Sequence, residues 1–279
     1  MQEQTTTGHD ALHARLHRSL GDYPERIVAC SGGIDSLVLA TLAHRAAPQN
    51  TTIAHTVTPA VPGPGTARVV AYANREGWKL ELVRSREFED ERYLANPVDR
   101  CYYCKSNLYE AVAALQSSSA AGDSAVILSG ANTDDLGEYR PGLIAADEHA
   151  VHHPYIEANW GKADVRHAAR VLGLAEAELP ASPCLASRLY TGTEVTAARL
   201  QAVEAGEAVV SQLTGIGVVR CRIREDDVHI EVMAEDRDRV NDRVVDAVRI
   251  AMTAVEPSLA TVVLDDENYR AGRSFLRVS

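Results

Sequence analysis

The sequence lacks the segments that would place a protein in or across a membrane. No stretch approaches the run of about eighteen apolar residues that a membrane-spanning helix needs. The N-terminal segment has neither an apolar core nor a small-residue cleavage site, so it predicts no secretory signal. We therefore expect a cytoplasmic protein without a membrane partner. Thiols stay reduced there, so closely spaced cysteines among the five are expected in metal or catalytic sites rather than in disulfides.

Basic residues are also scarce relative to acidic ones. The 28 Lys and Arg residues stand against 39 Asp and Glu, which gives a formal net charge of −11. Neutralising a polyanion requires clustered Lys and Arg, so this balance argues against a nucleic-acid partner. A local basic pocket for a small anion remains possible. The 279 residues, 46% of them hydrophobic, predict a globular protein of one large domain or two small ones.

Apolar runs alternate with helical patterns through the first two-thirds of the chain, which predicts a parallel sheet with helices on both faces, an α/β fold. The predicted strands lie at 26–30, 52–57, 79–83 and 125–128. The helical patterns lie at 10–20, 37–47, 68–77, 107–115 and 162–172. The remaining segments at 59–65, 89–104 and 131–194 look irregular or turn-rich, apart from the helix at 162–172.

From Thr196 the pattern changes to helix, strand, strand, helix, strand. This order predicts a separate small α+β domain. We expect the boundary at Thr191–Gly192, which gives domains 1–191 and 192–279.

The segment Ser31-Gly-Gly-Ile-Asp-Ser36 lies where the first strand gives way to a helix. Gly32 and Gly33 allow a tight turn whose N–H groups can bind phosphate, and the helix N-terminus adds partial positive charge. Ser31 and Ser36 offer hydroxyl groups, and Asp35 could hold Mg²⁺ or cap the helix. Neither the Walker spacing nor the dinucleotide fingerprint is present. An ordinary strand–turn–helix connection is the alternative interpretation.

Three of the five cysteines stand in unusual contexts. Cys101 and Cys104 form a C-x-x-C pair, which suits half a zinc site, a redox pair or part of an iron–sulfur site; two unrelated core thiols are the alternative. Cys184 lies in the proline-pinned segment 180–188 beside Arg188, which would stabilise a thiolate. This context favours a presented nucleophile over a buried structural cysteine. We assign no chemistry to Cys30 and Cys221, which lie in apolar strand patterns.

Taken together, these segments resemble the LarE family of ATP-dependent sulfur transferases, part of the PP-loop superfamily, which supplies sulfur to the nickel-pincer nucleotide of lactate racemase. The stretches that carry the resemblance are 30–36, 96–105, 130–142, 162–166, 180–188 and 219–224. The resemblance implies cleavage of ATP between its α and β phosphates to adenylate a carboxylate. It also implies that Ser31 to Ser36 hold the phosphates and that Gly130 and Asn132 lie near the nucleotide.

The resemblance further implies that Cys184 delivers sulfur to the adenylated carboxylate, most directly that of pyridinium-3,5-dicarboxylate mononucleotide. Members with one cysteine there are sacrificial and end with dehydroalanine. Members with three cysteines hold a [4Fe–4S] cluster. Cys101, Cys104 and Cys184 are all present here, which favours the cluster form, with the sacrificial route as its alternative. The family also implies a homo-oligomer.

Arg220 and Arg222 alternate along a predicted strand and so share one face. Paired guanidinium groups suit a phosphate or carboxylate, and the resemblance implies that they bind the mononucleotide substrate together with Arg188. Two surface arginines paired with the acidic run 225–227 are the alternative. The sequence departs from the family pattern at 59–67 and 152–154. These departures leave open a LarE-like enzyme with a different small acceptor.

Other functions stay open at this point. A PP-loop tRNA thiolase needs a large basic face, and an amidating synthetase needs an ammonia source, for which no catalytic cysteine follows Met1. A structural zinc or cluster protein is a candidate of another class. It would use Cys101, Cys104 and Cys184, with His152 or His153 as a fourth ligand.

Overall fold

The computed structural model describes residues 14–118, 125–137, 140–180 and 183–275. The chain forms two compact units, one of Met1–Arg86 and Cys101–Ser182, the other of Glu87–Arg100 and Pro183–Ser279. The chain therefore passes between the units three times, after Arg86, after Arg100 and after Ser182. The boundary expected at Thr191–Gly192 falls inside the second unit.

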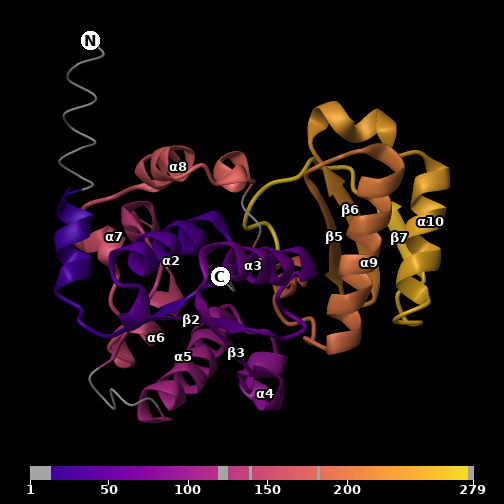
Figure 1. Cartoon of the computed structure of the whole chain (residues 1–279). Helices are drawn as coiled ribbons and strands as arrows, with labels where there is room; N and C mark the ends of the chain where they lie inside the picture. The colour runs from indigo at the N-terminus through magenta and orange to yellow at the C-terminus, as the bar shows by residue number, and fades with distance from the viewer. Residues whose placement is uncertain (1–13, 119–124, 138–139, 181–182, 276–279) are drawn as a thin grey trace. The chain divides into compact units, whose positions relative to one another are not determined.

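The first unit contains a sheet of four parallel strands in the order β3-β2-β1-β4, of which β2 and β3 are labelled in Figure 1. This confirms the predicted α/β fold. The strands are β1 (Arg26–Ala29), β2 (Thr51–Thr56), β3 (Lys79–Val83) and β4 (Val126–Leu128). The helices are α2 (Ile34–Ala46), α3 (Gly63–Glu76), α5 (Arg100–Ser118), which begins with the last residue of the other unit, α6 (Pro141–Glu148), α7 (Pro154–Glu157) and α8 (Lys162–Val171).

Helices cover both faces of this sheet because successive strand residues point to opposite sides. Val28, Ile53 and Leu128 are buried in one core cluster together with residues of α2, α3 and α8. Ile27 and Ala54 belong to a second cluster with residues of α5 and α6. This arrangement of three layers, helices, sheet and helices, follows from strands that are apolar on both faces.

The strand order places a topological switch point between β1 and β4. The chain proceeds from β1 outward through β2 to β3, then returns through α5 to β4 on the other side of β1. Ligands of open α/β sheets bind at such a point, outside the carboxyl ends of the strands. The segments that leave β1 and β4 are therefore the natural candidates for a binding site.

Several helices begin where the sequence predicted loops. Helix α3 starts at Gly63, inside the expected loop 59–65, and α5 starts at Arg100, inside the expected irregular segment 89–104. Helices α6 and α7 lie in the segment 131–194, where only one helix was expected. Helices α3, α6 and α7 each carry a proline in the first turn, where proline is tolerated because the N–H there has no helical acceptor. Reading proline as a helix breaker caused the errors at these three helices.

The second unit contains a three-stranded sheet in the order β5-β6-β7, with β5 and β6 antiparallel and β6 and β7 parallel. This mixed sheet with two long helices confirms the predicted small α+β architecture. Its elements are α4 (Glu91–Leu94), α9 (Ala197–Thr214), β5 (Val219–Arg224), β6 (Asp227–Val232), α10 (Asp242–Thr253) and β7 (Thr261–Leu264).

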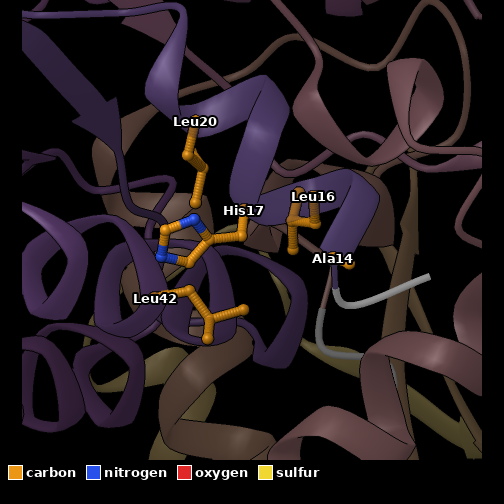
Figure 2. A pocket seen from close by; sticks show the side chains of 5 residues that line it. All are labelled: Ala14, Leu16, His17, Leu20 and Leu42. Atoms are coloured by element: carbon orange, nitrogen blue, oxygen red, sulfur yellow. The ribbon is translucent and has the colours of Figure 1, made fainter. Parts of the chain in front are cut away.

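Residues 14–21 form the described part of the predicted N-terminal helix; positions 10–13 lie outside the described residues. Leu16 and Leu20 are buried and line a pocket with Ala14, His17 and Leu42 of α2 (Figure 2). No residue predicted to carry chemistry lines this pocket. None of the described helices is both long and apolar enough to cross a bilayer.

Candidate functional site

The predicted phosphate loop connects β1 to α2 at the carboxyl edge of the sheet. Gly32 has φ +79°, a left-handed conformation that favours glycine. A Cβ at Gly32 would lie 2.4 Å from the carbonyl oxygen of Gly65 in α3. Glycine is therefore required here for two reasons, the backbone angle and the close approach of α3.

Helix α2 begins directly after Gly33, three residues earlier than predicted, so Asp35 and Ser36 lie in its first turn. The first N–H groups of a helix have no acceptor within it, and no side chain caps α2. The Ser36 hydroxyl donates to the carbonyl oxygen of Gly33 at 2.9 Å and accepts from the N–H of Ser31 at 3.1 Å. Ser36 thus braces the loop, while the N-terminus of α2 stays available to an anion.

The segment after β4 packs against the same turn. A Cβ at Gly130 would lie 3.0 Å from the carbonyl carbon of Asp35 and 3.1 Å from the nitrogen of Ser36. Asn132 is buried, and its side-chain oxygen accepts from the N–H of Asp134 at 3.1 Å. The structure therefore brings Gly130 onto the phosphate loop and uses Asn132 to shape the turn that follows β4.

Lys162, to which the sequence analysis gave no role, also reaches this edge. Its ammonium group forms an ion pair with Oδ2 of Asp35, and its backbone N–H donates to Oδ2 of Asp134 at 3.2 Å. Oδ1 of Asp35 is buried and has no hydrogen-bond partner among the described residues. A lysine at the first position of a helix opposes the helix dipole. Because Lys162 is the first residue of α8, the sequence itself indicated that an acidic residue elsewhere compensates its charge.

Two histidines, the buried His55 and the half-buried His153, belong to the same edge. His55 on β2 is hydrogen-bonded through Nδ1 to the carbonyl oxygen of Cys30 at 2.7 Å and through Nε2 to the hydroxyl of Thr66 at 2.9 Å. Burial lowers the pKa of His55. Nδ1 of His153 lies 2.8 Å from the hydroxyl of Ser129, and burial lowers its pKa as well. Burial therefore disfavours the charged form of both rings.

Cys101 and Cys104 lie in the first turn of α5 and are half-buried. Residues three apart on a helix share one face, so the two thiols are neighbours. Cys184 belongs to the second unit. Within the described part of the chain, no three or more His, Cys, Asp or Glu side chains are arranged to hold a metal ion.

Cys184 precedes the short 3₁₀ turn η6 (Leu185–Arg188) and is half-buried. Residues 181–182 of the predicted segment 180–188 lie outside the described residues. The Arg188 guanidinium donates to the carbonyl oxygens of Pro183 at 2.8 Å and Cys184 at 3.2 Å. It also forms a bidentate ion pair with Glu207, both contacts at 2.9 Å. Burial opposes the charge of Arg188, but Glu207 outweighs it and raises the pKa.

Asn96 and Arg100 also hold the segment that follows Cys184 by hydrogen bonds to its backbone. Asn96, at φ +53°, donates from its side-chain nitrogen to the carbonyl oxygens of Tyr190 and Thr193, both at 2.8 Å. Arg100 donates to the side-chain oxygen of Asn96 and, at 2.9 Å, to the carbonyl oxygen of Ala186. Arg100, the residue before Cys101, therefore binds the backbone two residues after Cys184. Sequence reasoning missed this role because the partners are nearly ninety residues apart.

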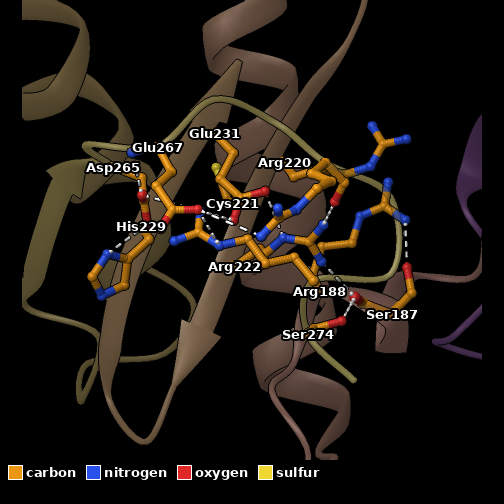
Figure 3. A network of polar contacts seen from close by, with 12 residues as sticks. Ser187, Arg188, Arg220, Cys221, Arg222, His229, Glu231, Asp265, Glu267 and Ser274 are labelled. Atoms are coloured by element: carbon orange, nitrogen blue, oxygen red, sulfur yellow. Dashed lines mark hydrogen bonds and ion pairs between the residues drawn. The ribbon is translucent and has the colours of Figure 1, made fainter. Parts of the chain in front are cut away.

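The two alternating arginines Arg220 and Arg222 of β5 are both buried. Figure 3 shows their side chains within a network of polar contacts. Arg222 donates to Glu231 at 2.7 Å and to the carbonyl oxygens of Ser187 and Arg270, both at 3.0 Å. Arg220 donates to the carbonyl oxygen of Val219 at 2.7 Å, and its guanidinium lies 5.1 Å from the centre of the Tyr269 ring. Their burial disagrees with the alternative of exposed arginines paired with residues 225–227.

Glu231 lies at the centre of this network. It has no exposed surface and binds both Arg222 and Arg273, the latter at 2.8 Å. Burial of the Arg220 side chain lowers its pKa, and the positive charge of Arg188 lowers it further. Both effects disfavour the charged form of Arg220.

Three relatives were found among known proteins, whereas no protein-family model matches the chain. An uncharacterized protein of Synechocystis sp. is 34% identical over 92% of this chain and 94% of its own length. An uncharacterized protein of Methanocaldococcus jannaschii is 28% identical over 64% of this chain and 66% of its own. The pyridinium-3,5-bisthiocarboxylic acid mononucleotide synthase of Lactiplantibacillus plantarum is 30% identical over 93% of this chain and 92% of its own. By this last likeness, which extends over both units, the chain belongs to the LarE family of sulfurtransferases.

Proposed function

We propose that this protein uses ATP to adenylate a carboxylate of pyridinium-3,5-dicarboxylate mononucleotide and then transfers sulfur to it, in biosynthesis of the nickel-pincer cofactor. The observation that carries the ATP step is the uncapped N-terminus of α2 behind the turn at Gly32, at the switch point of the sheet. The relative that makes the bisthiocarboxylic acid mononucleotide supports the choice of acceptor.

In this proposal the loop Ser31–Ser36 binds the phosphates of ATP. The N–H groups at the start of α2 supply hydrogen bonds and partial positive charge, which stabilise the phosphates without moving. Gly130 allows the second wall of the site to approach this turn, and Asn132 fixes the shape of that wall. Adenylation makes the carboxyl oxygen a good leaving group, since AMP departs in place of oxide.

Asp35 fits a role in binding Mg²⁺ together with ATP. Its Oδ1 is buried without a hydrogen-bond partner among the described residues, and hard carboxylate oxygens are the ligands that Mg²⁺ prefers. The ion would neutralise charge on the departing pyrophosphate. Lys162 would keep the other oxygen of Asp35 compensated and so limit its repulsion of the phosphates.

Sulfur transfer is assigned to Cys184. In the sacrificial route its thiolate attacks the carbonyl carbon of the acyl-adenylate and displaces AMP, which gives a thioester. Loss of the Cα proton to a base then breaks the Cβ–Sγ bond, and the electron pair leaves with the thiocarboxylate. Residue 184 becomes dehydroalanine. Arg188 and Arg100 hold the backbone of this loop by its carbonyl oxygens, which fixes the position of the thiol.

The mononucleotide substrate is assigned to the face of β5 that carries Arg220 and Arg222. Burial and the neighbouring Arg188 lower the pKa of Arg220, so an anion bound beside it would favour the charged guanidinium. Arg222 and Arg188 would act mainly by holding the 183–188 loop to this face, since each binds carbonyl oxygens of that loop.

The test supplies ATP and the dicarboxylate mononucleotide to anaerobically prepared protein. We expect AMP, pyrophosphate and a thiocarboxylate; formation of ADP and phosphate would overturn the proposal. Cys184→Ala should still release pyrophosphate but form no thiocarboxylate. Cys221→Ala is the matched control, because that thiol is fully buried in β5 and should be dispensable for transfer.

The [4Fe–4S] cluster predicted on Cys101, Cys104 and Cys184 stays a prediction. Two thiols on α5 are an incomplete donor set, since such a cluster needs three protein thiolates or more. Iron and sulfide content of the anaerobic protein decides the matter. Cluster-bound iron that disappears in Cys101→Ala supports the cluster, whereas colourless protein that loses the elements of H₂S from Cys184 after turnover supports the sacrificial route. The predicted homo-oligomer likewise stays a prediction.

A further inference from the structure

The first turn of α3 lies directly on the phosphate loop. The carbonyl oxygen of Gly65 would be 2.4 Å from a Cβ at Gly32, and Gly65 is itself buried. Such a close approach of two backbones requires glycine on both sides. Side chains one turn further along α3 are therefore carried to the edge of the loop.

Arg68 is the residue three positions after Gly65, on the same face of α3. Its Nε donates to the carbonyl oxygen of Gly32 at 3.0 Å. Its Nη2 lies 3.9 Å from the point where a Cβ of Gly65 would stand. The guanidinium group is thus fixed against the turn of the phosphate loop by one of its three nitrogens.

The charge of Arg68 has no acidic partner among the described residues, and neither Nη nitrogen has a hydrogen-bond partner there. Its neighbours behave differently. Arg75, two turns further along α3, binds Glu76 at 3.0 Å, and Arg45 at the end of α2 binds the same carboxylate at 2.9 Å. Lys162 is paired with Asp35. Of these four cations, Arg68 alone has no carboxylate as an ion-pair partner among the described residues.

We propose that Arg68 binds the terminal phosphates of ATP, and the pyrophosphate that leaves, through Nη1 and Nη2. The planar fork of a guanidinium matches two phosphate oxygens, and the bond from Nε to Gly32 orients the fork in advance. This inference rests on the proposed use of ATP and adds to it a binding residue specific for the pyrophosphate half of the nucleotide. Nothing in the spacing of the Ser31–Ser36 motif points to Arg68.

The experiment measures equilibrium binding of ATP, AMP and inorganic pyrophosphate to the full-length protein in the presence of Mg²⁺. For Arg68→Ala we expect binding of ATP and pyrophosphate to weaken at least tenfold, which corresponds to about 1.4 kcal/mol. Binding of AMP should be unchanged, because AMP lacks the phosphates that Arg68 contacts. Arg75→Ala, on the same helix but half-exposed and paired with Glu76, is the control and should bind all three ligands as the unaltered protein does.

Arg68→Lys separates charge from loop support, since it keeps a cation but cannot hold Gly32 through Nε. It should retain more pyrophosphate affinity than Arg68→Ala. If both variants lose pyrophosphate and AMP equally, Arg68 only supports the loop and the inference is wrong. Unchanged pyrophosphate affinity in Arg68→Ala overturns it as well, with the proposed function intact. If the unaltered protein binds neither ATP nor pyrophosphate, the proposed function itself fails, and the inference with it.

Discussion

The two candidate sites differ in how completely their polar and charged groups are paired within the protein. At the carboxyl edge of the first sheet, α2 lacks a side-chain cap, one oxygen of Asp35 is buried without a partner, and Arg68 has no carboxylate beside it, all within the described residues. In the second unit, Arg188 and Arg222 direct every guanidinium nitrogen to a carboxylate, a carbonyl or a hydroxyl of the protein.

This difference distinguishes groups that are available to a ligand from groups that hold the protein backbone in place. Groups that the protein leaves unsatisfied gain most from a ligand, because their desolvation is otherwise uncompensated. Groups that are fully paired hold the backbone in one arrangement. The phosphate loop is accordingly the part of the molecule suited to take up ATP, and the arginine network is the part suited to fix the loop that carries Cys184.

The largest effect should come from removing the centre of the paired network. Glu231→Ala leaves Arg222 and Arg273 buried without their shared carboxylate, so the free energy of unfolding should fall by about 3 to 5 kcal/mol. Chemical denaturation measures this loss. Glu267→Ala is the control, since its side chain is 64% exposed, and it should cost less than about 0.5 kcal/mol. Equal losses of unfolding free energy in the two variants would show that the buried carboxylate of Glu231 stabilises the protein no more than the exposed one of Glu267.

A smaller effect is expected from altering the unpaired site. Gly32→Ala brings a Cβ against Gly65 at a positive φ, so the loop must move, and ATP binding should weaken about a hundredfold, or about 2.7 kcal/mol. Gly77→Ala shares the positive φ, at +72°, but its Cβ meets no atom within 4 Å. It should lower stability by about 1 kcal/mol and leave ATP binding unchanged. Titration with ATP compares the two, and equal affinities would show that the loop tolerates displacement.

The smallest effect concerns pH and again the paired network. Burial would raise the pKa of Asp265, but the N–H of Glu267 and the Arg273 guanidinium outweigh it and hold the pKa below the ordinary value of 3.8. A carboxylate with a lowered folded-state pKa contributes stability above pH 3.8 that is lost as the pH falls below it. In Asp265→Asn, the free energy of unfolding should therefore fall by about 1 kcal/mol less on acidification than in the unaltered protein. Denaturation measured over a range of acidic pH checks this, and an equal loss in both proteins would contradict it.

The sequence predicted the features that repeat or stand close together along the chain. Alternating apolar runs gave the four parallel strands, and the compact Ser31–Ser36 motif gave the loop at the switch point. Alternation predicted Arg220 and Arg222 on one face of a strand, but not that both are buried. Partners distant in sequence could not be predicted: Lys162 meets Asp35 across 127 positions, and Arg68 meets Gly32 only because two glycines let α3 approach the loop.

The excursion of residues 87–100 into the second unit has a consequence for how this protein can be divided. A fragment that starts at Gly192 would lack Asn96, whose carbonyl accepts from Gly192 and whose side chain donates to Thr193, and Leu94, whose carbonyl accepts from Val195. The C-terminal unit is thus completed by a strap encoded before Cys101, so its interior is assembled only after the chain has returned from the other unit. Truncation, circular permutation and domain exchange should therefore keep residues 87–100 together with the C-terminal unit, and should not cut the chain at the change of sequence pattern near residue 192.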